Sequence, residues 1–257
     1  MVKGLYTAYT GLINEQNRMD VLTNNLANAS TVGFKKEGAT SQAFDDVLAI
    51  KIKDTTDPLY ARPLGAMSMG VKIGETYTDF RQGSMRSTEN TYDVAISGTG
   101  FFAVEFTNKA GETSTKYTRD GSFILNKDGY LVTKDGDFVL GSNNNRIRVN
   151  PNLDSRIDEQ GNIWQNDTLT ATIGVTDFED YDYLEHYGEN YYEPVEGYTQ
   201  KQGDYKIMSG YLEMSNMSVV TEMVNMITVS RAYETNQKIV QSYDSTLEIA
   251  ANQLGKL

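Results

Sequence analysis

The chain opens with MVKGLYTAYTGLINEQNRMDVLTNNLANA (residues 1–29), a stretch in which apolar side chains recur every seven residues. The positions of this repeat are Leu5, Leu12, Met19 and Leu26. A spacing of seven puts the four side chains on one face of an α-helix. We therefore predict a helix from about Lys3 to Ala29, with Gly33 as its stop signal.

The C-terminal end of the chain repeats the design. Its heptad positions are Met226, Tyr233, Val240, Leu247 and Leu254. Neither Gly nor Pro occurs between Ser218 and Gln253, so this stretch predicts a single helix of about 35 residues. Each stripe is also compatible with an ordinary core helix. We expect the two ends to pair in a coiled-coil-like domain. A pair this thin leaves apolar side chains uncovered, so neighbouring subunits should cover the remainder.

The middle of the chain has the composition of β-strands. Apolar and β-branched runs such as Gly100–Phe106 and Gly129–Thr133 alternate with Asp-Gly pairs at residues 120–121, 128–129 and 135–136. Asp-Gly is favoured in tight hairpin turns because these turns need positive φ. The spacing predicts a meander of short antiparallel strands.

Residues 34–75 fit neither pattern, and we predict a linker or extended arm with a short helix over residues 44–52. The predicted fold is α+β, with paired N- and C-terminal helices and an inserted, mainly antiparallel β domain. The predicted boundaries are 1–33 for the N-terminal helix, 34–75 for the arm, 76–209 for the β domain and 210–257 for the C-terminal helix.

Composition excludes several classes of function. The formal net charge is −12 and no stretch concentrates Lys or Arg, so a nucleic-acid partner is not expected. The chain has no Cys, which excludes disulfides and thiolate zinc sites. Polar residues interrupt the first 20 positions, so we expect no cleaved signal peptide and, for an exported protein, an intact N-terminus.

Five stretches, in order along the chain, resemble the flagellar axial proteins of rod and hook. They are LTNNLANASTVGFK (22–35), DVAISGTGFF (93–102), YTRDGSF (117–123), GYLEMSNMS (210–218) and SRAYETN (230–236). The resemblance implies a structural rod subunit that polymerises through its terminal helices, with itself and with neighbouring rod and hook subunits. It further implies location in the basal body, transmission of torque from motor to hook, and export through the flagellar secretion apparatus. Between the two longer rod components we slightly favour the distal type over the proximal type.

The residues that we expect at the assembly interface belong to both ends of the chain. They are Leu5, Leu12, Met19, Asn24, Asn25, Leu26, Asn28, Met226, Arg231, Tyr233, Glu234, Val240, Leu247 and Leu254. Asparagine is a mediocre helix former, so the three Asn residues are expected to bond another chain, with capping of the helix end as the alternative. Arg231 and Glu234 are expected to make register-setting polar contacts.

Three features resemble catalytic or ligand sites, and each has a plainer interpretation. Ser97-Gly98-Thr99-Gly100 lacks the Lys of a phosphate loop and precedes a predicted strand, so we interpret it as a β-turn. His186 is the single His and is expected in a surface loop. The carboxylates between Asp177 and Glu196 are expected to form a solvated face. We therefore predict no catalytic residues, no cofactor, no metal site and no small-molecule substrate.

Two other classes of function stay open at this point. One is a hydrolase of cell-wall glycan that uses carboxylates of the acidic stretch 177–196. The other is an export chaperone or cap that meets the flagellar axis without remaining in it.

Overall fold

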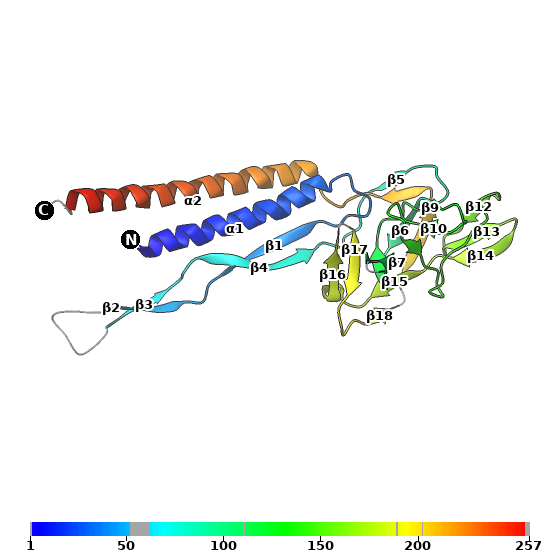
Figure 1. The fold of residues 1–257 in the computed structure, drawn as a ribbon, viewed down its shortest axis with the longest axis horizontal. Helices are drawn as coiled ribbons and strands as arrows, with labels where there is room; N and C mark the ends of the chain where they lie inside the picture. The colour runs from blue at the N-terminus through cyan, green and yellow to red at the C-terminus, as the bar shows by residue number, and fades with distance from the viewer. Residues whose placement is uncertain (1, 52–61, 110, 189, 202, 255–257) are drawn as a thin grey trace. The chain divides into compact units, whose positions relative to one another are not determined.

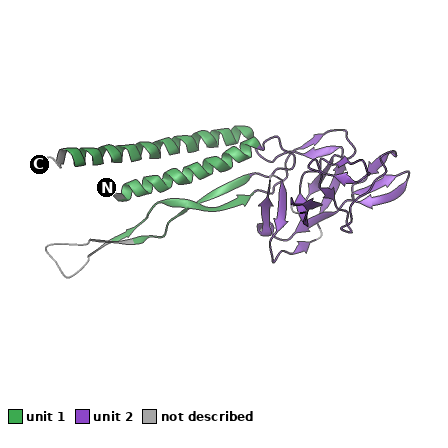
Figure 2. Ribbon diagram, in the orientation of Figure 1, with its two compact units in different colours: residues 1–27, 37–78, 218–257 green, residues 28–36, 79–217 purple. Residues whose placement is uncertain are grey.

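The computed structural model describes residues 2–51, 62–109, 111–188, 190–201 and 203–254 (Figure 1). These residues form two compact units (Figure 2). Unit 1 comprises the described parts of 1–27, 37–78 and 218–257, and unit 2 comprises those of 28–36 and 79–217. The fold is α+β, as predicted, and the chain passes from one unit to the other four times.

Unit 1 contains the two helices α1 (Val2–Ala27) and α2 (Val219–Leu254). Ser218 precedes α2 as its N-cap, since its backbone oxygen accepts from the Glu222 N–H at 3.0 Å and its Oγ from the Thr221 N–H at 3.5 Å. Each end of the two helices lies within two residues of the end that the sequence predicts. In the described part of the chain, no helical segment combines the length and the hydrophobicity of a membrane span.

The strands of unit 1 form two antiparallel ladders. β1 (Glu37–Ala43) pairs with β4 (Val71–Thr78), and β2 (Val47–Lys51) pairs with β3 (Arg62–Met67). The expected short helix over 44–52 is therefore wrong for its described part, and most of the expected linker consists of paired strands. A helix of nine residues, about two and a half turns, would lack the length at which an isolated helix becomes stable, whereas the returning strand supplies hydrogen-bonding partners for the backbone.

The main sheet of unit 2 has nine strands among the residues that the structure describes. Its order is β16-β17-β8-β7-β11-β10-β9, and β15, which also pairs with β18, flanks β7. Its members are β7 (Phe101–Thr107), β8 (Thr113–Thr118), β9 (Ile124–Leu125), β10 (Leu131–Val132), β11 (Phe138–Val139), β15 (Val175–Phe178), β16 (Leu184–Tyr187), β17 (Tyr191–Pro194) and β18 (Gln200–Lys201). A 3₁₀ turn, η1 (Tyr181–Tyr183), precedes β16.

Smaller ladders complete unit 2. β5 (Met85–Ser87) pairs with β20 (Tyr211–Glu213), and β6 (Val94–Gly98) pairs with β19 (Tyr205–Ser209). β12, β13 and β14 form a three-stranded sheet. Their bounds are Ser155–Ile157, Asn162–Gln165 and Thr168–Thr172. All of these pairings are antiparallel, in agreement with the prediction.

Strand β7 is buried on both faces. Phe102 and Val104 belong to one hydrophobic cluster, together with residues such as Phe123 and Ile163. Phe101 and Ala103 belong to a second cluster on the opposite face. Side chains alternate across a strand, so a strand covered on both sides becomes an unbroken apolar run, and this explains the sequence Phe-Phe-Ala-Val.

Five hairpin turns of unit 2 share one geometry. In each turn the N–H of the fourth residue donates to the backbone oxygen of the first, and the first N–H donates to the oxygen of the fifth. The first and fifth residues of these turns are 108 and 112, 126 and 130, 133 and 137, 141 and 145, and 158 and 162. The fourth residue has positive φ in every case, and it is Gly in four turns and Asn144 in the other. This is the three-residue loop with a left-handed bulge residue, and the Asp-Gly pairs at 128–129 and 135–136 lie in such turns.

Asp120-Gly121 is not a hairpin of this kind. A Cβ at Gly121 would lie 1.6 Å from the backbone oxygen of Val94, and the Gly121 oxygen accepts from the Val94 N–H at 2.9 Å. The sequence requires Gly here because two backbones approach each other closely, and not because of positive φ.

Candidate assembly interface

Helices α1 and α2 pack against each other in opposite directions (Figure 1). A Cβ on Gly4 would lie 2.3 Å from Tyr243 Oη, and a Cβ on Gly11 would lie 3.0 Å from Asn236 Nδ2. These two pairs are each seven residues apart on their own helix. The glycines therefore provide two spaces in α1 into which side chains of α2 fit. Sequence reasoning missed Gly4 and Gly11 because it followed only the apolar positions.

Most of the predicted heptad residues are partly covered within the chain. Half-buried residues are Leu5, Leu12, Met19, Leu26, Met226, Tyr233 and Val240. Exposed residues are Arg231, Glu234 and Leu247. Leu254 ends α2, and its side chain is outside the described residues. The structure thus uses much of the predicted stripe within the chain.

A different stripe on α2 is more exposed than the predicted one. The exposed fractions are 73% for Val220, 49% for Met223, 57% for Val224 and 54% for Ile227. Their spacing is i, i+3, i+4, i+7, which gathers them on one face. The buried residue Val229 follows Ile227 by two positions, roughly 200° around the helix. We call these four residues the outer stripe. The spacing alone could have found it.

α1 also exposes apolar side chains, in its N-terminal half. Tyr6, Tyr9 and Ile13 are all exposed and follow the spacing i, i+3, i+7. An apolar row left open on both helices is typical of a surface that meets another protein.

The face of α1 that turns toward β1 and β4 is polar and buried. Thr10 Oγ1 lies 3.4 Å from the Met69 oxygen, to which it donates, and Asn14 Nδ2 donates to Ser41 Oγ at 3.1 Å. A Cβ on Gly70 would lie 2.1 Å from Thr10 Oγ1. These contacts attach the hairpin to the helix through side-chain hydrogen bonds, a function that the heptad analysis did not anticipate.

The three predicted asparagines have different environments. Asn25 is 0% exposed, and its amide bonds both backbone groups of Glu37. The expectation that Asn25 bonds another chain is therefore corrected: its side chain is used within its own unit. Asn24 is exposed on α1, and Asn28 lies beyond the helix in unit 2, where its Oδ1 accepts from Thr31 Oγ1 at 3.1 Å.

Several stretches of the recognised pattern meet inside unit 2. Glu213 pairs with Lys35 and Arg119, which come from three different stretches. A Cβ on Gly33 would lie 2.5 Å from the Arg119 backbone, and the φ of Gly33 is +72°. Gly33 is thus required by this close approach and not as the stop of α1, which ends at Ala27. Sequence reasoning quoted Lys35, Arg119 and Glu213 but did not assign them a role.

The acidic stretch is not uniformly solvated. Asp177 is 1% exposed and accepts hydrogen bonds from Thr99, Tyr181 and the Phe178 N–H. Burial alone would favour its neutral form, but these bonds together hold the pKa of Asp177 below its usual value. Burial and the hydrogen bond to Asp177 raise the pKa of Tyr181 to about 12. His186 lies half-buried in β16 and not in a surface loop.

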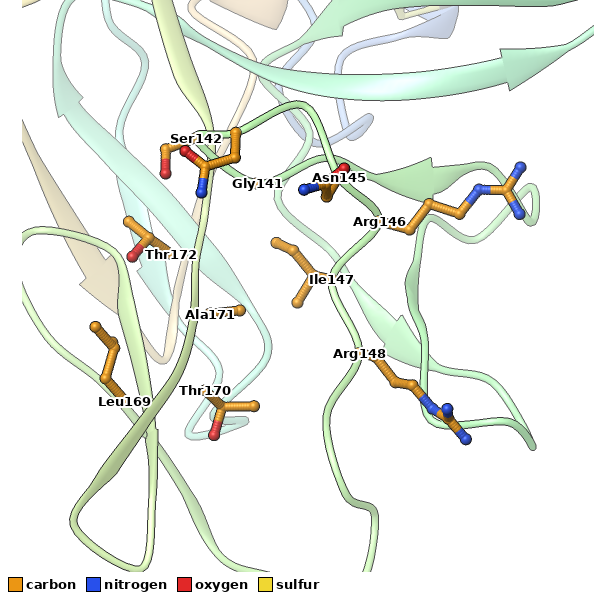
Figure 3. Close-up of a pocket in the computed structure, with 11 residues that line it drawn as sticks. Gly141, Ser142, Asn145, Arg146, Ile147, Arg148, Leu169, Thr170, Ala171 and Thr172 are labelled. Carbon is orange, nitrogen blue, oxygen red and sulfur yellow. The ribbon is translucent and has the colours of Figure 1, made fainter.

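An open hollow of about 430 Å³ lies between residues 141–148 and β14 (Figure 3). Arg146 and Arg148 point away from Leu169 and Thr170 on the opposite wall. Arg146 makes two hydrogen bonds to Glu105, at 2.7 and 2.8 Å. The described lining contains no carboxylate and no His, so it offers no acid–base pair. Within the described ranges no three His, Asp or Glu side chains gather as a metal site.

Three family models match the chain. Residues 5–35 match "Flagella basal body rod protein", residues 95–165 match "Flagellar hook protein FlgE/F/G D1 domain", and residues 208–254 match "Flagellar basal body rod FlgEFG protein C-terminal".

Curated relatives match along nearly the full length. The flagellar basal-body rod protein FlgG of Buchnera aphidicola subsp. Schizaphis graminum is 34% identical over 96% of this chain and 98% of its own. The rod protein FlgF of Mesorhizobium japonicum is 31% identical over 99% of both chains. The flagellar hook-basal body complex protein FlhO of Bacillus subtilis is 30% identical over 100% of both.

Proposed function

The chain belongs to the family of flagellar basal-body rod proteins of the FlgG and FlgF type, and from this premise we propose that it polymerises through its terminal helices to carry torque along the rod. It acts as a structural subunit and not as an enzyme. Its partners are further copies of itself and the neighbouring rod and hook subunits.

The observation that carries this proposal is the outer stripe of α2. Val220, Met223, Val224 and Ile227 are four adjacent apolar side chains with about half or more of their surface exposed. Covering them removes apolar surface from water, which favours association by about 25 cal/mol per Å². The predicted residues Leu5, Leu12, Met19, Leu26, Met226, Tyr233, Val240, Leu247 and Leu254 contribute whatever surface the pairing of α1 with α2 leaves open.

The first test replaces Val224 with Asp in a strain that lacks the native copy. Val224 is exposed, so the isolated subunit should keep its fold while a buried charge blocks the interface. We expect basal bodies without a complete rod in electron micrographs. Gln237→Asp is the matched control, because it adds the same charge at an exposed site of α2 outside the stripe. Normal rods from Val224→Asp would refute assembly through this stripe.

We place the subunit in the distal rod in preference to the proximal rod. FlgG and FlgF relatives match at 34% and 31%, so similarity does not separate the two positions. An epitope inserted after Asp135, in an exposed turn, allows the subunit to be located on isolated basal bodies. Label near the hook supports the distal position, and label near the membrane ring supports the proximal one.

We also propose that the flagellar export apparatus secretes the subunit with α1 intact. Gly4 and Gly11 accommodate Tyr243 and Asn236, so removal of the first turns would uncover α2. Sequencing the N-terminus of the subunit from purified basal bodies tests this, since a cleaved chain would begin after Gly4.

A further inference from the structure

Glu213 is the centre of a buried charge cluster in unit 2. Its side chain is 0% exposed. Oε1 accepts from Lys35 Nζ at 2.5 Å and from the Gly83 N–H at 2.8 Å, while Oε2 accepts from Arg119 Nη1 at 3.2 Å. The side chains of Lys35 and Arg119 are 1% and 4% exposed, so water screens neither ion pair.

The groups around Glu213 come from distant parts of the chain. Lys35 follows α1 by eight residues, Gly83 lies between β4 and β5, and Arg119 follows β8. Glu213 itself is the last residue of β20, six positions before α2 begins. The backbone repeats the connection, because the Gly33 N–H donates to the Glu213 oxygen at 2.7 Å.

Asn216 connects the same passages of the chain a few residues further on. Its Oδ1 accepts from the Lys36 N–H at 2.9 Å, and its Nδ2 donates to the backbone oxygens of Asp79 and Arg81 at 2.6 and 3.0 Å. All segments of unit 2 that continue into unit 1 are therefore bonded to residues 213–216.

The cluster has two cations for one carboxylate. Lys35 also donates to the Arg81 backbone oxygen at 3.0 Å, and Arg119 Nη2 donates to the Gly98 oxygen at 2.9 Å. Arg119 Nε is buried without a hydrogen-bond partner among the described residues. The carboxylate of Asp79 is held by the guanidinium of Arg81, so it supplies little further compensation.

The compensation of charge in the cluster depends on Glu213. Burial lowers the pKa of Lys35, Glu213 opposes this shift, and the charge of Arg119 lowers the pKa further. Removing one partner of a buried pair leaves an uncompensated charge, which is far more costly than removing the whole pair. Without Glu213, two like charges would remain buried beside each other.

We propose that Glu213 is the counter-ion that closes unit 2, so that residues 33–36 dock against the sheet only when the C-terminal segment brings its carboxylate. Docking of residues 33–36 therefore requires Glu213, which lies near the other end of the chain. The segment that follows α1 and the segment that precedes α2 then take their native positions in the same step. This device operates in the single subunit and is independent of the proposed assembly.

The test uses the full-length monomer, with Trp164 of β13 as a fluorescent probe of unit 2 during urea unfolding. Glu213→Gln should lower the urea midpoint markedly. Lys35→Met added to Glu213→Gln should raise the midpoint again, because it removes one uncompensated cation. Glu105→Gln is the matched control, since it breaks the exposed pair with Arg146 in the same unit and should change the midpoint little.

Recovery of the urea midpoint in the double variant shows whether Glu213 acts as a counter-ion or only through ordinary packing contacts. If Lys35→Met lowers the midpoint of Glu213→Gln or leaves it unchanged, the proposal is wrong. Should Glu213→Gln fail to fold, recovery of a folded protein in the double variant still supports the proposal, and continued failure overturns it.

Hydrogen exchange locates the effect in the chain. In Glu213→Gln the Gly33 amide should exchange about ten- to a hundredfold faster, because its segment opens locally. The Gly161 amide, bonded within its own turn to Asp158, should keep its rate. Equal acceleration at both amides would contradict a local closing step and indicate general destabilisation.

Discussion

The side-chain amide of Asn25 forms two hydrogen bonds to the backbone of Glu37. Asn25 Nδ2 donates to the Glu37 oxygen at 2.7 Å, and the Glu37 N–H donates to Asn25 Oδ1 at 3.0 Å. A carboxamide offers the same donor and acceptor as a peptide group, so α1 serves as the hydrogen-bonding partner of the first residue of β1. The hairpin thereby begins at a fixed point on the helix.

Replacing Asn25 with Ala should destabilise unit 1 by about 1–3 kcal/mol, because the half-buried Glu37 N–H and C=O lose their hydrogen bonds to the Asn25 side chain. Urea unfolding followed by far-UV circular dichroism measures this change. Gln16→Ala, at an exposed site of the same helix, controls for the higher helix propensity of Ala. An Asn25→Ala variant as stable as the control would show that the two bonds contribute nothing.

Gly121→Ala should destabilise unit 2 more than Gly136→Ala does. The added Cβ at Gly121 would meet the Val94 backbone oxygen at 1.6 Å, so β6 must move, and overpacking of this kind costs about 1–3 kcal/mol or more. Gly136 has open space around it and a φ of +96°, so its change costs about 1 kcal/mol of backbone strain. Trp164 fluorescence in urea ranks the two variants, and the reverse order would contradict the steric argument.

Alkaline pH should destabilise the protein partly through Tyr181. Its pKa is raised to about 12 in the folded state, against about 10 in an unfolded chain. The neutral phenol therefore contributes stability that is complete below pH 10 and is lost as pH rises through 12. The fall in the urea midpoint from pH 8 to pH 11 should be smaller in Tyr181→Phe than in the wild type. An equal fall would assign the loss to Tyr117 and Tyr191, whose pKa values burial also raises.

The side chain of the first residue should stabilise some hairpin turns and not others. Asn126 Oδ1 accepts from the N–H groups of Asp128 and Tyr130, at 3.0 and 2.8 Å. Asn126→Ala should cost about 1 kcal/mol, since both donors lose this partner. Asn143→Ala, in a turn that begins with Gly141, should change the urea midpoint little. Similar shifts in both variants would mean that Asn126 does not stabilise its turn.

Local sequence was sufficient for the two helices and for hairpin turns such as the one at Gly129, but not for Asp120-Gly121. The seven-residue period of Leu5 and Met226 and the absence of Gly and Pro near Val240 act over neighbouring residues, and so do the hydrogen bonds of a helix. The turn at Gly129 was predictable for the same reason. The pairing of β2 with β3 was not predictable, because the two strands are separated along the chain. The sequence of Val47–Lys51 does not indicate which strand it pairs with.

The sequence by itself therefore determined the two terminal helices, the antiparallel character of the middle and the resemblance to rod proteins. Only the tertiary structure decided which faces of the helices are covered: it buried Val229 and Asn25 and left Val224 open. It also brought Lys35, Arg119 and Glu213 together. A helical period specifies that a face is apolar, but which surface covers that face depends on contacts between residues far apart in the chain, and these exist only once the fold has formed.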